Sequence, residues 1–278
     1  MSDNKIWFIT GCSTGFGRCL TEELLKTNHK VVATARDPKT LDDLVKKYPD
    51  QILTIALDVT KKSDIEKAVK AATSKFGRID VLVNNAGYGM LGAVEEASES
   101  DIKRIFDTNV FGLIEMTKAV LPGMRSQKSG HILNISSVAG FASLPGFGIY
   151  NATKYAVEGM SEALHGEVAG LGIKVIIIEP GPFRTDFSNR SLGKAAEMQA
   201  YDEVLKTMRQ YTNNIDGKQP GDPVRGAQAM IELVSMNNPP LRIPFGQIAV
   251  DRIQYKIRNF SSDMKTHEKL IMGTDFPN

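Results

Sequence analysis

The chain of 278 residues has only two cysteines, Cys12 and Cys19, and they form no CxxC pair. This excludes a disulfide framework, and so few thiols are typical of a protein from a reducing compartment. Long apolar runs are missing too. Runs such as Val175–Ile178 fall far short of the roughly 20 residues that a membrane-spanning helix needs. The sequence therefore predicts a cytoplasmic protein without a membrane span.

A charge excess of either sign is also missing. The chain has 34 basic and 32 acidic residues, a net charge of +2, and no cluster of lysine or arginine. This balance argues against a nucleic-acid partner. The histidines lack the spacing of metal ligands, so we expect no metal; they are His29, His131, His165 and His267. The composition is otherwise that of an ordinary globular protein, and we expect its partner to be a small molecule.

Short apolar runs alternate along the chain with amphipathic helical stretches. The predicted strands are Ile6–Thr10, Val31–Ala35, Ile52–Leu57, Val81–Asn84, His131–Ser136 and Lys174–Glu179. The predicted helices include Arg18–Lys26, Ser63–Phe76, Glu99–Met124 and Tyr150–Gly170. Each strand is a nearly continuous apolar run, as expected for strands buried on both faces of a parallel sheet. We therefore predict an α/β fold, a Rossmann-type doubly wound parallel sheet in a three-layer αβα arrangement.

The alternation stops after Pro180. Residues 183–220 mix helical and loop patterns, and we expect them to form a helical substrate lid. A helical pattern resumes between Pro220 and Asn238, and residues 241–278 read as a C-terminal extension, helical from Gln247. Since no linker or repeat divides the chain, we expect a single domain over residues 1–278.

A glycine-rich loop follows the first predicted strand and opens the first helix. It contributes Gly11, Ser13, Thr14, Gly15, Phe16 and Gly17. The glycines allow a tight turn and close approach of a ligand to the backbone, and the helix N-terminus offers N–H groups to a pyrophosphate. This is the βα turn at which dinucleotides bind. The loop predicts a dinucleotide site; a ligand-free turn is the plainer alternative.

Five separated motifs together resemble the short-chain dehydrogenase/reductase family. They are the glycine loop, Asn84-Asn85-Ala86-Gly87, Ser137, Tyr150-x-x-x-Lys154 and Pro180-Gly181, in family order over about residues 5–190. The resemblance implies an oxidoreductase that transfers a hydride between a nicotinamide and a carbonyl or secondary alcohol. The first third is similar to steroid- and retinol-type members, and equally to bacterial members of unassigned substrate.

The resemblance assigns catalytic roles that agree with residue chemistry. Tyr150 and Lys154 share a helix face, and a nearby ammonium favours a phenolate, so we expect Lys154 to lower the pKa of Tyr150. Ser137 follows a strand and can hydrogen-bond a substrate oxygen. Ser136 competes for this role, but the family's serine precedes its tyrosine by the interval of Ser137. Asn109 is unusual inside a helix, and the resemblance gives it a water that relays protons to Lys154.

Further residues are expected to contact the cofactor. Asn85, Ala86 and Gly87 would pack beside it. Asp58 would meet the adenine, with Val59 next to it. Tyr150 and Lys154 would lie at the nicotinamide end, where Lys154 holds the ribose, and Pro180, Gly181 and Thr185 would fix the carboxamide. The plainer alternatives are turn residues with local hydrogen bonds, since Asn, Asp, Gly and Pro all favour turns.

The end of the second predicted strand bears on the choice of cofactor. Ala35 stands where an acidic residue would bind the ribose hydroxyls, and Arg36 beside it can bind a 2′-phosphate. We therefore favour NADP(H). Asp37 lies 20 residues after Gly17, which fits a simple rule for NAD and keeps NAD(H) as the alternative. We interpret Asp37 instead as a helix N-cap before Pro38.

The combined prediction is an NADP(H)-dependent oxidoreductase acting on an apolar small molecule. Apolar residues that could line its pocket are Met90, Leu144, Phe147, Phe183, Phe187, Leu192 and Met198. An NAD-using epimerase or dehydratase is one alternative, although it would usually carry a different glycine pattern. A non-catalytic nucleotide sensor is another, although such proteins often lack the tyrosine or lysine. The resemblance also implies a homodimer or homotetramer, paired through the helices that start near Glu99 and Tyr150.

Overall fold

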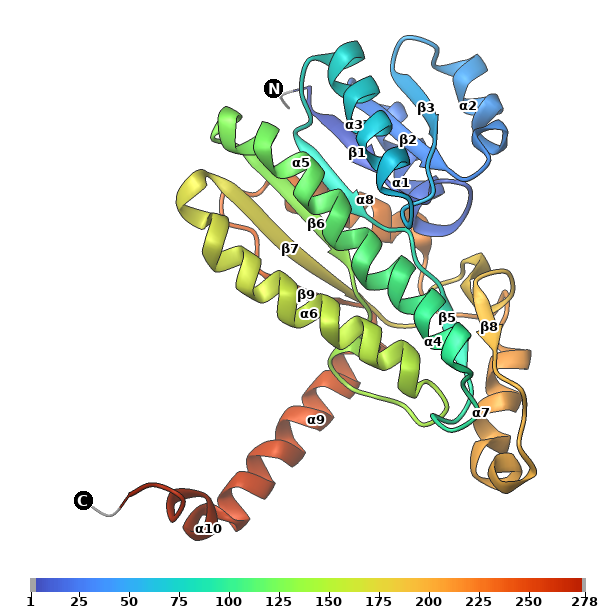
Figure 1. The fold of residues 1–278 in the computed structure, drawn as a ribbon, viewed down its shortest axis with the longest axis vertical. Coiled ribbons are helices and arrows are strands. Elements are labelled where there is room, and N and C mark those ends of the chain that lie inside the picture. The colour runs from blue at the N-terminus through green and yellow to red at the C-terminus, as the bar shows by residue number, and fades with distance from the viewer. Residues whose placement is uncertain (1–3, 277–278) are drawn as a thin grey trace.

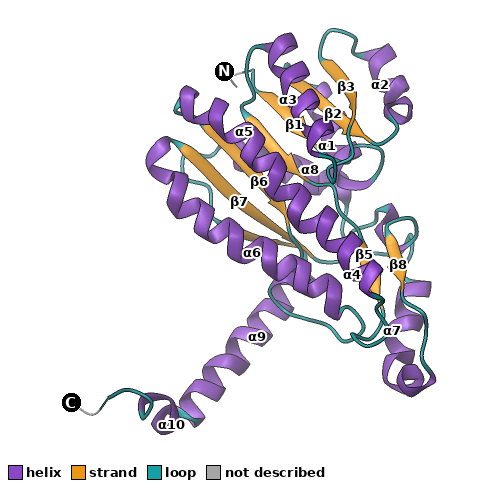
Figure 2. Ribbon diagram, viewed as in Figure 1, coloured by secondary structure: helices purple, strands orange, loops and turns teal. Residues whose placement is uncertain are grey.

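A computed structural model describes residues 4–276 of the chain. Its main sheet has seven parallel strands in the order β3-β2-β1-β4-β6-β7-β9 (Figures 1 and 2). The strands are β1 (Ile6–Ile9), β2 (Lys30–Ala35), β3 (Ile52–Ala56), β4 (Val81–Asn84), β6 (Gly130–Ile135), β7 (Ile173–Pro180) and β9 (Arg242–Phe245). The strand order reverses between β1 and β4, which is where ligands bind in open α/β sheets.

Helices cover both faces of the sheet and complete three layers (Figure 1). The helices are α1 (Gly15–Leu25), α2 (Asp42–Lys47), α3 (Lys62–Phe76), α4 (Glu99–Phe106), α5 (Leu113–Gln127), α6 (Gly148–Val168), α7 (Asp202–Asn214), α8 (Pro223–Ser235), α9 (Gln247–Thr266) and α10 (Glu268–Met272). Short 3₁₀ turns are η1 (Pro38–Leu41), η3 (Val138–Gly140), η4 (Ala169–Leu171), η5 (Asp186–Ser188) and η6 (Gln199–Tyr201). The predicted doubly wound α/β fold is confirmed.

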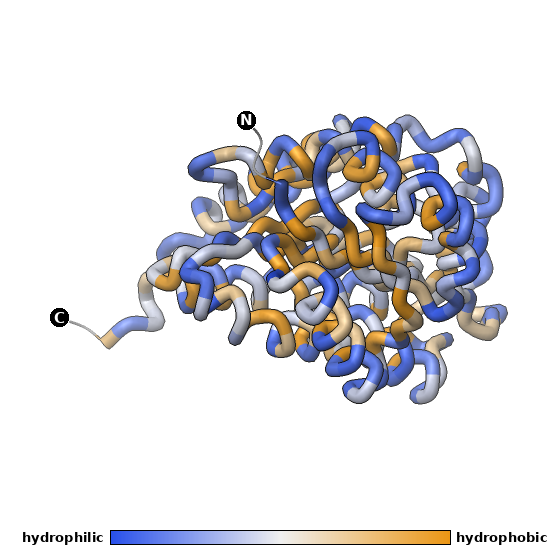
Figure 3. Tube along the Cα trace, turned by 90° about the horizontal axis from the view of Figure 1, so that it is seen from above, coloured by the Kyte–Doolittle hydropathy of each residue, from blue (hydrophilic) through white to orange (hydrophobic). Residues whose placement is uncertain are grey.

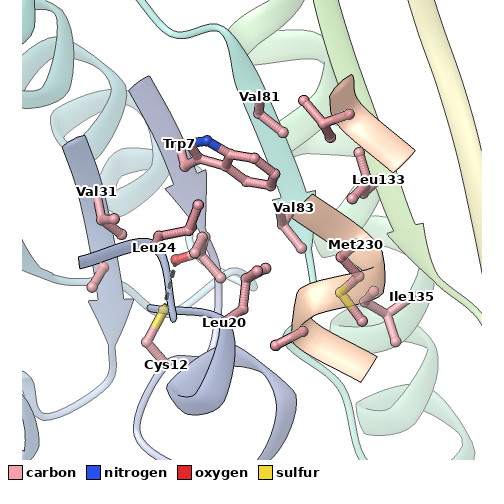
Figure 4. Close-up of a cluster of buried hydrophobic side chains, with 14 of the residues drawn as sticks. Trp7, Cys12, Leu20, Leu24, Val31, Val81, Val83, Leu133, Ile135 and Met230 are labelled. Atoms are coloured by element: carbon pink, nitrogen blue, oxygen red, sulfur yellow. Dashed lines mark hydrogen bonds between the residues drawn. The ribbon is translucent and has the colours of Figure 1, made fainter. Parts of the chain in front are cut away.

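Two apolar clusters hold the layers together, one on each face of the sheet. On β1, Trp7 and Ile9 point to one face and Phe8 to the other. The first cluster joins the sheet to α1 and α8, where Met230 packs (Figure 4). The second joins it to α3, α5 and α6. Because both faces are buried, the strands read as continuous apolar runs, and Figure 3 shows the apolar chain gathered in the interior.

The predicted helix Glu99–Met124 is not continuous. A π-helical segment, η2 (Asp107–Gly112), separates α4 from α5. Such segments are rare and frequently lie at functional sites. The helix that follows the sixth strand begins at Gly148 rather than at Tyr150, so Tyr150 lies in its first turn.

The region after β7 contains a strand besides the predicted helical and loop segments. Residues 183–220 contain η5, a short strand β8 (Leu192–Lys194), η6 and α7. Strand β8 pairs in parallel with β5 (Gly89–Leu91), and the two form a separate small sheet. The predicted mixture of helical and loop segments is thus present, and the short strand β8 is the part that the sequence analysis missed, because its partner β5 is distant in sequence.

The C-terminal extension begins with a strand that the sequence analysis missed. Strand β9 pairs with β7, with Ile177 opposite Arg242, and adds the seventh parallel strand. Helix α9 then projects away from the body of the molecule, and α10 lies at its far end (Figure 1). Near the middle of α9, Lys256 donates to the Phe141 carbonyl at 2.6 Å, which ties the first half of the helix to the loop after η3.

Replacing Met230 with alanine tests the packing of α8 on the sheet. Met230 is fully buried, so the truncation should lower the free energy of unfolding by about 2–5 kcal/mol. Met236, at the end of the same helix, is 37% exposed, and Met236→Ala should change it by less than about 0.5 kcal/mol. Urea denaturation of both variants measures this; equal losses would contradict the assigned core.

Candidate functional site

The turn between β1 and α1 forms a cradle for an anion. Gly11 and Gly15 have φ values of +72° and +59°, which side chains other than glycine adopt with strain. The N–H of Cys12 donates to the Thr34 carbonyl at 2.8 Å, so the turn is tied to β2. At the start of α1, Thr14 makes no side-chain capping bond to the described residues, and the first turn holds no acidic residue. The helix N-terminus can therefore accept a phosphate.

Gly17 lies behind this cradle rather than on its surface. A Cβ atom there would lie 2.4 Å from the Gly11 carbonyl oxygen and 2.6 Å from Asn85 Nδ2. The same Asn85 Nδ2 donates to the Thr10 carbonyl at 2.8 Å and to the Gly11 carbonyl at 2.9 Å. Gly17 thus permits close packing, and Asn85 fixes the loop.

One cleft of about 890 Å³ runs along the carboxyl ends of the strands. Sixteen of the residues predicted to bind the cofactor line this cleft, and so do Ser137 and the competing Ser136. They are Gly11, Ser13, Thr14, Gly15, Phe16, Arg36, Asp58, Val59, Asn85, Ala86, Gly87, Tyr150, Lys154, Pro180, Gly181 and Thr185. Gly17 and Asn109 are not on the wall. The volume suits an organic cofactor with a substrate.

Tyr150 is buried against aromatic rings at one end of the cleft. Its ring centroid lies 5.6 Å from that of Phe187 and 6.2 Å from that of Phe147. Burial raises the pKa of Tyr150 to about 12, although a hydrogen bond with Ser137 opposes the rise. In the protein alone, desolvation therefore dominates over the Ser137 bond, and the expectation that Lys154 lowers the pKa of Tyr150 stays a prediction. The contact with Tyr150 supports Ser137 over Ser136.

Lys154 lies one turn further along α6. Its Nζ atom donates to the Ile135 carbonyl at 2.7 Å and lies 5.8 Å from the centroid of the Tyr150 ring. Burial lowers the pKa of Lys154 to about 8, and the carboxylate of Glu158 opposes this change. At neutral pH the side chain is therefore still mainly an ammonium, close to the phenol.

Asn109 lies in the π-helical segment η2, and its amide is used within the protein. Its Oδ1 accepts from the Tyr88 N–H at 3.0 Å, while Nδ2 donates to the Tyr88 carbonyl at 2.8 Å and to Thr153 Oγ1 at 3.2 Å. A Cβ on Gly87 would lie 3.1 Å from Asn109 Oδ1 and 3.8 Å from Lys154 Nζ. Asn109 thus links the segment after β4 to α6 immediately behind the cleft.

The acidic and basic residues after β2 have separate roles. The carboxylate of Asp37 accepts from the Lys39 N–H at 3.1 Å, with Pro38 at the first position of η1. The interpretation of Asp37 as an N-cap is confirmed. Arg36 is exposed and lines the cleft. The basic side chain, not the acidic one, is therefore the group presented to a ligand.

Asp58 lies at the carboxyl end of β3 in a tight turn. Its Oδ1 accepts from the Thr60 N–H at 3.0 Å and from Thr60 Oγ1 at 2.7 Å. Burial acts to raise the pKa of Asp58, but these bonds and the charges of Lys61 and Arg36 outweigh it and lower the pKa. The carboxylate is therefore ionised and can accept a hydrogen bond from a ligand in the cleft.

Apolar side chains also line the cleft. Six of the seven predicted apolar residues line it; Met198 does not. Helix α7 adds Met208, Tyr211 and Ile215, which the sequence analysis missed. This helix is held over the cleft by Arg209, whose Nη2 lies 2.6 Å from Oε1 of the buried Glu96. The sequence alone does not predict this ion pair, because an arginine in an amphipathic helix most often faces solvent.

Residues 4–276 contain no group of three or more His, Cys, Asp or Glu side chains that could hold a metal ion. Within the same described range, every helix is too short or too polar to cross a bilayer.

The family model described as "short chain dehydrogenase" matches residues 5–195, which contain the cradle, Tyr150 and Lys154. The chain belongs to this family. Its members are NAD(P)-dependent oxidoreductases, which agrees with the cleft.

Similar proteins support the assignment over nearly the whole chain. An oxidoreductase, BOA17, from Botryotinia fuckeliana is 39% identical over 89% of this chain and 90% of its own. A 3-ketodihydrosphingosine reductase from Bacteroides thetaiotaomicron is 37% identical over 88% of both. The crystal structure of a short-chain dehydrogenase from Streptomyces avermitilis is 41% identical, covers 99% of this chain and 100% of its own, and has a TM-score of 0.92.

Two similar solved structures hold different nicotinamide cofactors. A serine dehydrogenase in complex with NADP⁺ is 32% identical, with a TM-score of 0.74 over 86% of this chain and 94% of its own. A 3-ketoacyl-(acyl-carrier-protein) reductase from Brucella melitensis in complex with NADH is 28% identical, with a TM-score of 0.72 over 87% and 96%. A nicotinamide cofactor thus suits the family, and the choice between the two forms depends on local residues.

Gly17→Ala tests the cradle of this short-chain dehydrogenase. The added methyl group would meet backbone, which cannot move away cheaply, so we expect about 1–3 kcal/mol of destabilisation and weaker cofactor binding. Gly166 on α6 has open space around a Cβ, and Gly166→Ala should be neutral or stabilising. Thermal unfolding and NADP⁺ titration measure both; a Gly17→Ala variant that binds NADP⁺ like wild type would refute this packing.

Proposed function

We propose that the chain transfers a hydride between NADP(H) and a carbonyl or secondary alcohol of an apolar small molecule. The observation that carries this proposal is the meeting of Ser137, Tyr150 and Lys154 on the wall of the cleft that also contains the glycine cradle. An acid–base pair and a dinucleotide site in one cleft are what hydride transfer to a carbonyl requires.

The residues of the cleft suit this cofactor. The cradle can hold the pyrophosphate at the N-terminus of α1, Arg36 can bind a 2′-phosphate, and Thr185 can meet the carboxamide. Bound there, the nicotinamide supplies or accepts the hydride. The Ser137 hydroxyl holds the substrate oxygen, and the Tyr150 hydroxyl donates its proton to that oxygen during reduction. The Lys154 ammonium stabilises the phenolate that remains.

The apolar residues around Tyr150 support an apolar substrate. Phe147 and Phe187 pack around the Tyr150 ring, and Met208 and Tyr211 of α7 face the same cleft. A polar substrate bound against these side chains would bury its polar groups without hydrogen-bond partners, which disfavours binding. Residues 183–220 would then act as the substrate lid.

Two further expectations stay predictions. A homodimer or homotetramer is expected from the resemblance. A cytoplasmic location is expected from the use of cysteine, and Cys12 and Cys19 are both free in the structure.

Tyr150→Phe should abolish turnover and spare cofactor binding. Loss of the proton donor should lower kcat by at least about 100-fold. Tyr155, one turn further on and donating to the Phe141 carbonyl, gives the matched control Tyr155→Phe, which should keep kcat. The assay follows NADPH consumption with a panel of apolar ketones, aldehydes and quinones; undiminished turnover by Tyr150→Phe would refute the role.

Arg36→Ala should remove the preference for NADPH. Loss of a charge-assisted contact to the 2′-phosphate should raise KM for NADPH by about tenfold or more and leave KM for NADH nearly unchanged. Lys39→Ala removes a nearby exposed cation and should change neither value. Equal changes in both KM values for Arg36→Ala would contradict the assignment of Arg36.

A further inference from the structure

Three carboxylates converge on one guanidinium behind the cleft. Arg242 Nε, on β9, lies 3.0 Å from Glu158 Oε2 and 3.8 Å from Glu179 Oε1, and its Nη2 lies 2.7 Å from Glu162 Oε2. The side chains of Glu158 and Glu179 are 6% and 2% exposed, whereas that of Glu162 is 60% exposed. Two buried carboxylates therefore share a single cation, and their charge is not fully balanced by it.

This cluster adjoins Lys154. Glu158 follows Lys154 by one helical turn on α6, so the two side chains lie on the same face. A Cβ on Gly140 would lie 2.6 Å from Ser136 Oγ, 3.0 Å from the Lys154 carbonyl oxygen and 3.1 Å from Glu158 Cγ. Glycine at position 140 thus lets the loop after β6 close over the pair. Both Lys154 and Glu158 are buried, so little water separates their charges.

The buried oxygens of the cluster lack donors. Glu158 Oε1, Glu179 Oε1 and Ser136 Oγ have no hydrogen-bond partner among residues 4–276. A buried carboxylate oxygen without a hydrogen-bond donor costs free energy, and protonation of Glu179 would reduce this cost. Burial and the neighbouring charge of Glu158 raise the pKa of Glu179 to about 7, so this proton is present for part of the neutral range. Burial raises the pKa of Glu158 as well, but the bond and charge of Arg242 and the charge of Lys154 oppose this rise, so Glu158 is the carboxylate of the pair that carries the charge.

We propose that Glu158 is a positioning residue whose carboxylate, held by Arg242, keeps Lys154 in its ammonium form and so keeps a cation beside the Tyr150 phenol. The proposal rests on the proposed function, since it assigns the phenol its acid–base role. Glu158 touches neither substrate nor cofactor and acts only through Lys154. Glu158 is the negative charge that opposes the effect of burial on Lys154.

The sign of the effect follows from the charges that face Lys154 and Glu158. These are Glu162 on α6, Glu179 on β7 and Arg242 on β9. Burial lowers the pKa of Lys154 and Glu158 raises it, and together they set it at about 8. Removing the charge of Glu158 lowers this pKa further, so the ammonium is lost near neutral pH. Tyr150 then loses its cation, and its pKa rises.

The test is the ionisation of Tyr150 in the full chain with NADP⁺ bound, read as phenolate absorbance against the same protein carrying Tyr150→Phe. Glu158→Gln should shift the midpoint upward by at least about half a pH unit. Glu162→Gln removes a carboxylate from the same Arg242 and should leave it unchanged. An unshifted midpoint in Glu158→Gln, an equal shift in Glu162→Gln, or no Tyr150 signal in the accessible pH range would each overturn the proposal.

If Glu158→Gln does not fold, Glu158→Met, which removes the same charge with a side chain of similar volume, decides. An upward shift of the midpoint supports the proposal, and an unchanged or lower midpoint overturns it. A purely structural role of the cluster would lower the melting temperature without moving the midpoint. The titration needs no substrate. Its failure is therefore distinct from failure of the proposed function, which shows as turnover that survives Tyr150→Phe.

Discussion

The parallel pairing of the strands is the constraint on which the site depends. Because all seven strands of the main sheet run in one direction, their carboxyl ends meet along one edge, and each loop that leaves this edge contributes to the same cleft. The glycine cradle follows β1, Arg36 follows β2, Asp58 follows β3 and Asn85 follows β4. Residues far apart in sequence therefore meet without any special pairing among them.

Burial at this edge sets the chemistry as much as the residue types do. In the protein alone, desolvation moves the pKa values of Tyr150 and Lys154 in opposite directions, up for the phenol and down for the amine. Both shifts disfavour the charged pair that catalysis needs. Charges from outside the pair must therefore restore it, and the carboxylate of Glu158 and a bound oxidised nicotinamide both act in that direction.

The sequence predicts those parts of the molecule that depend on residues close together along the chain. Six strands were predicted because strands buried on both faces are continuous apolar runs, and most of the cleft residues because they follow those strands. Strand β9 was missed because it is short and contains Pro244, which suits only an edge strand. Strands β5 and β8 pair across about a hundred residues, and Glu158, Glu179 and Arg242 come from three elements. Such contacts leave no pattern along the chain.

The transfer of deuterium tests the central claim most directly. The purified chain is given NADPH that carries deuterium at C4 of the nicotinamide, together with the panel of apolar ketones and aldehydes. Mass spectrometry then follows the alcohols formed. Hydride transfer within the cleft predicts one deuterium at the carbinol carbon, lost in Tyr150→Phe. NADPH that binds while no panel member gains deuterium would contradict the account and favour a nucleotide-sensing role.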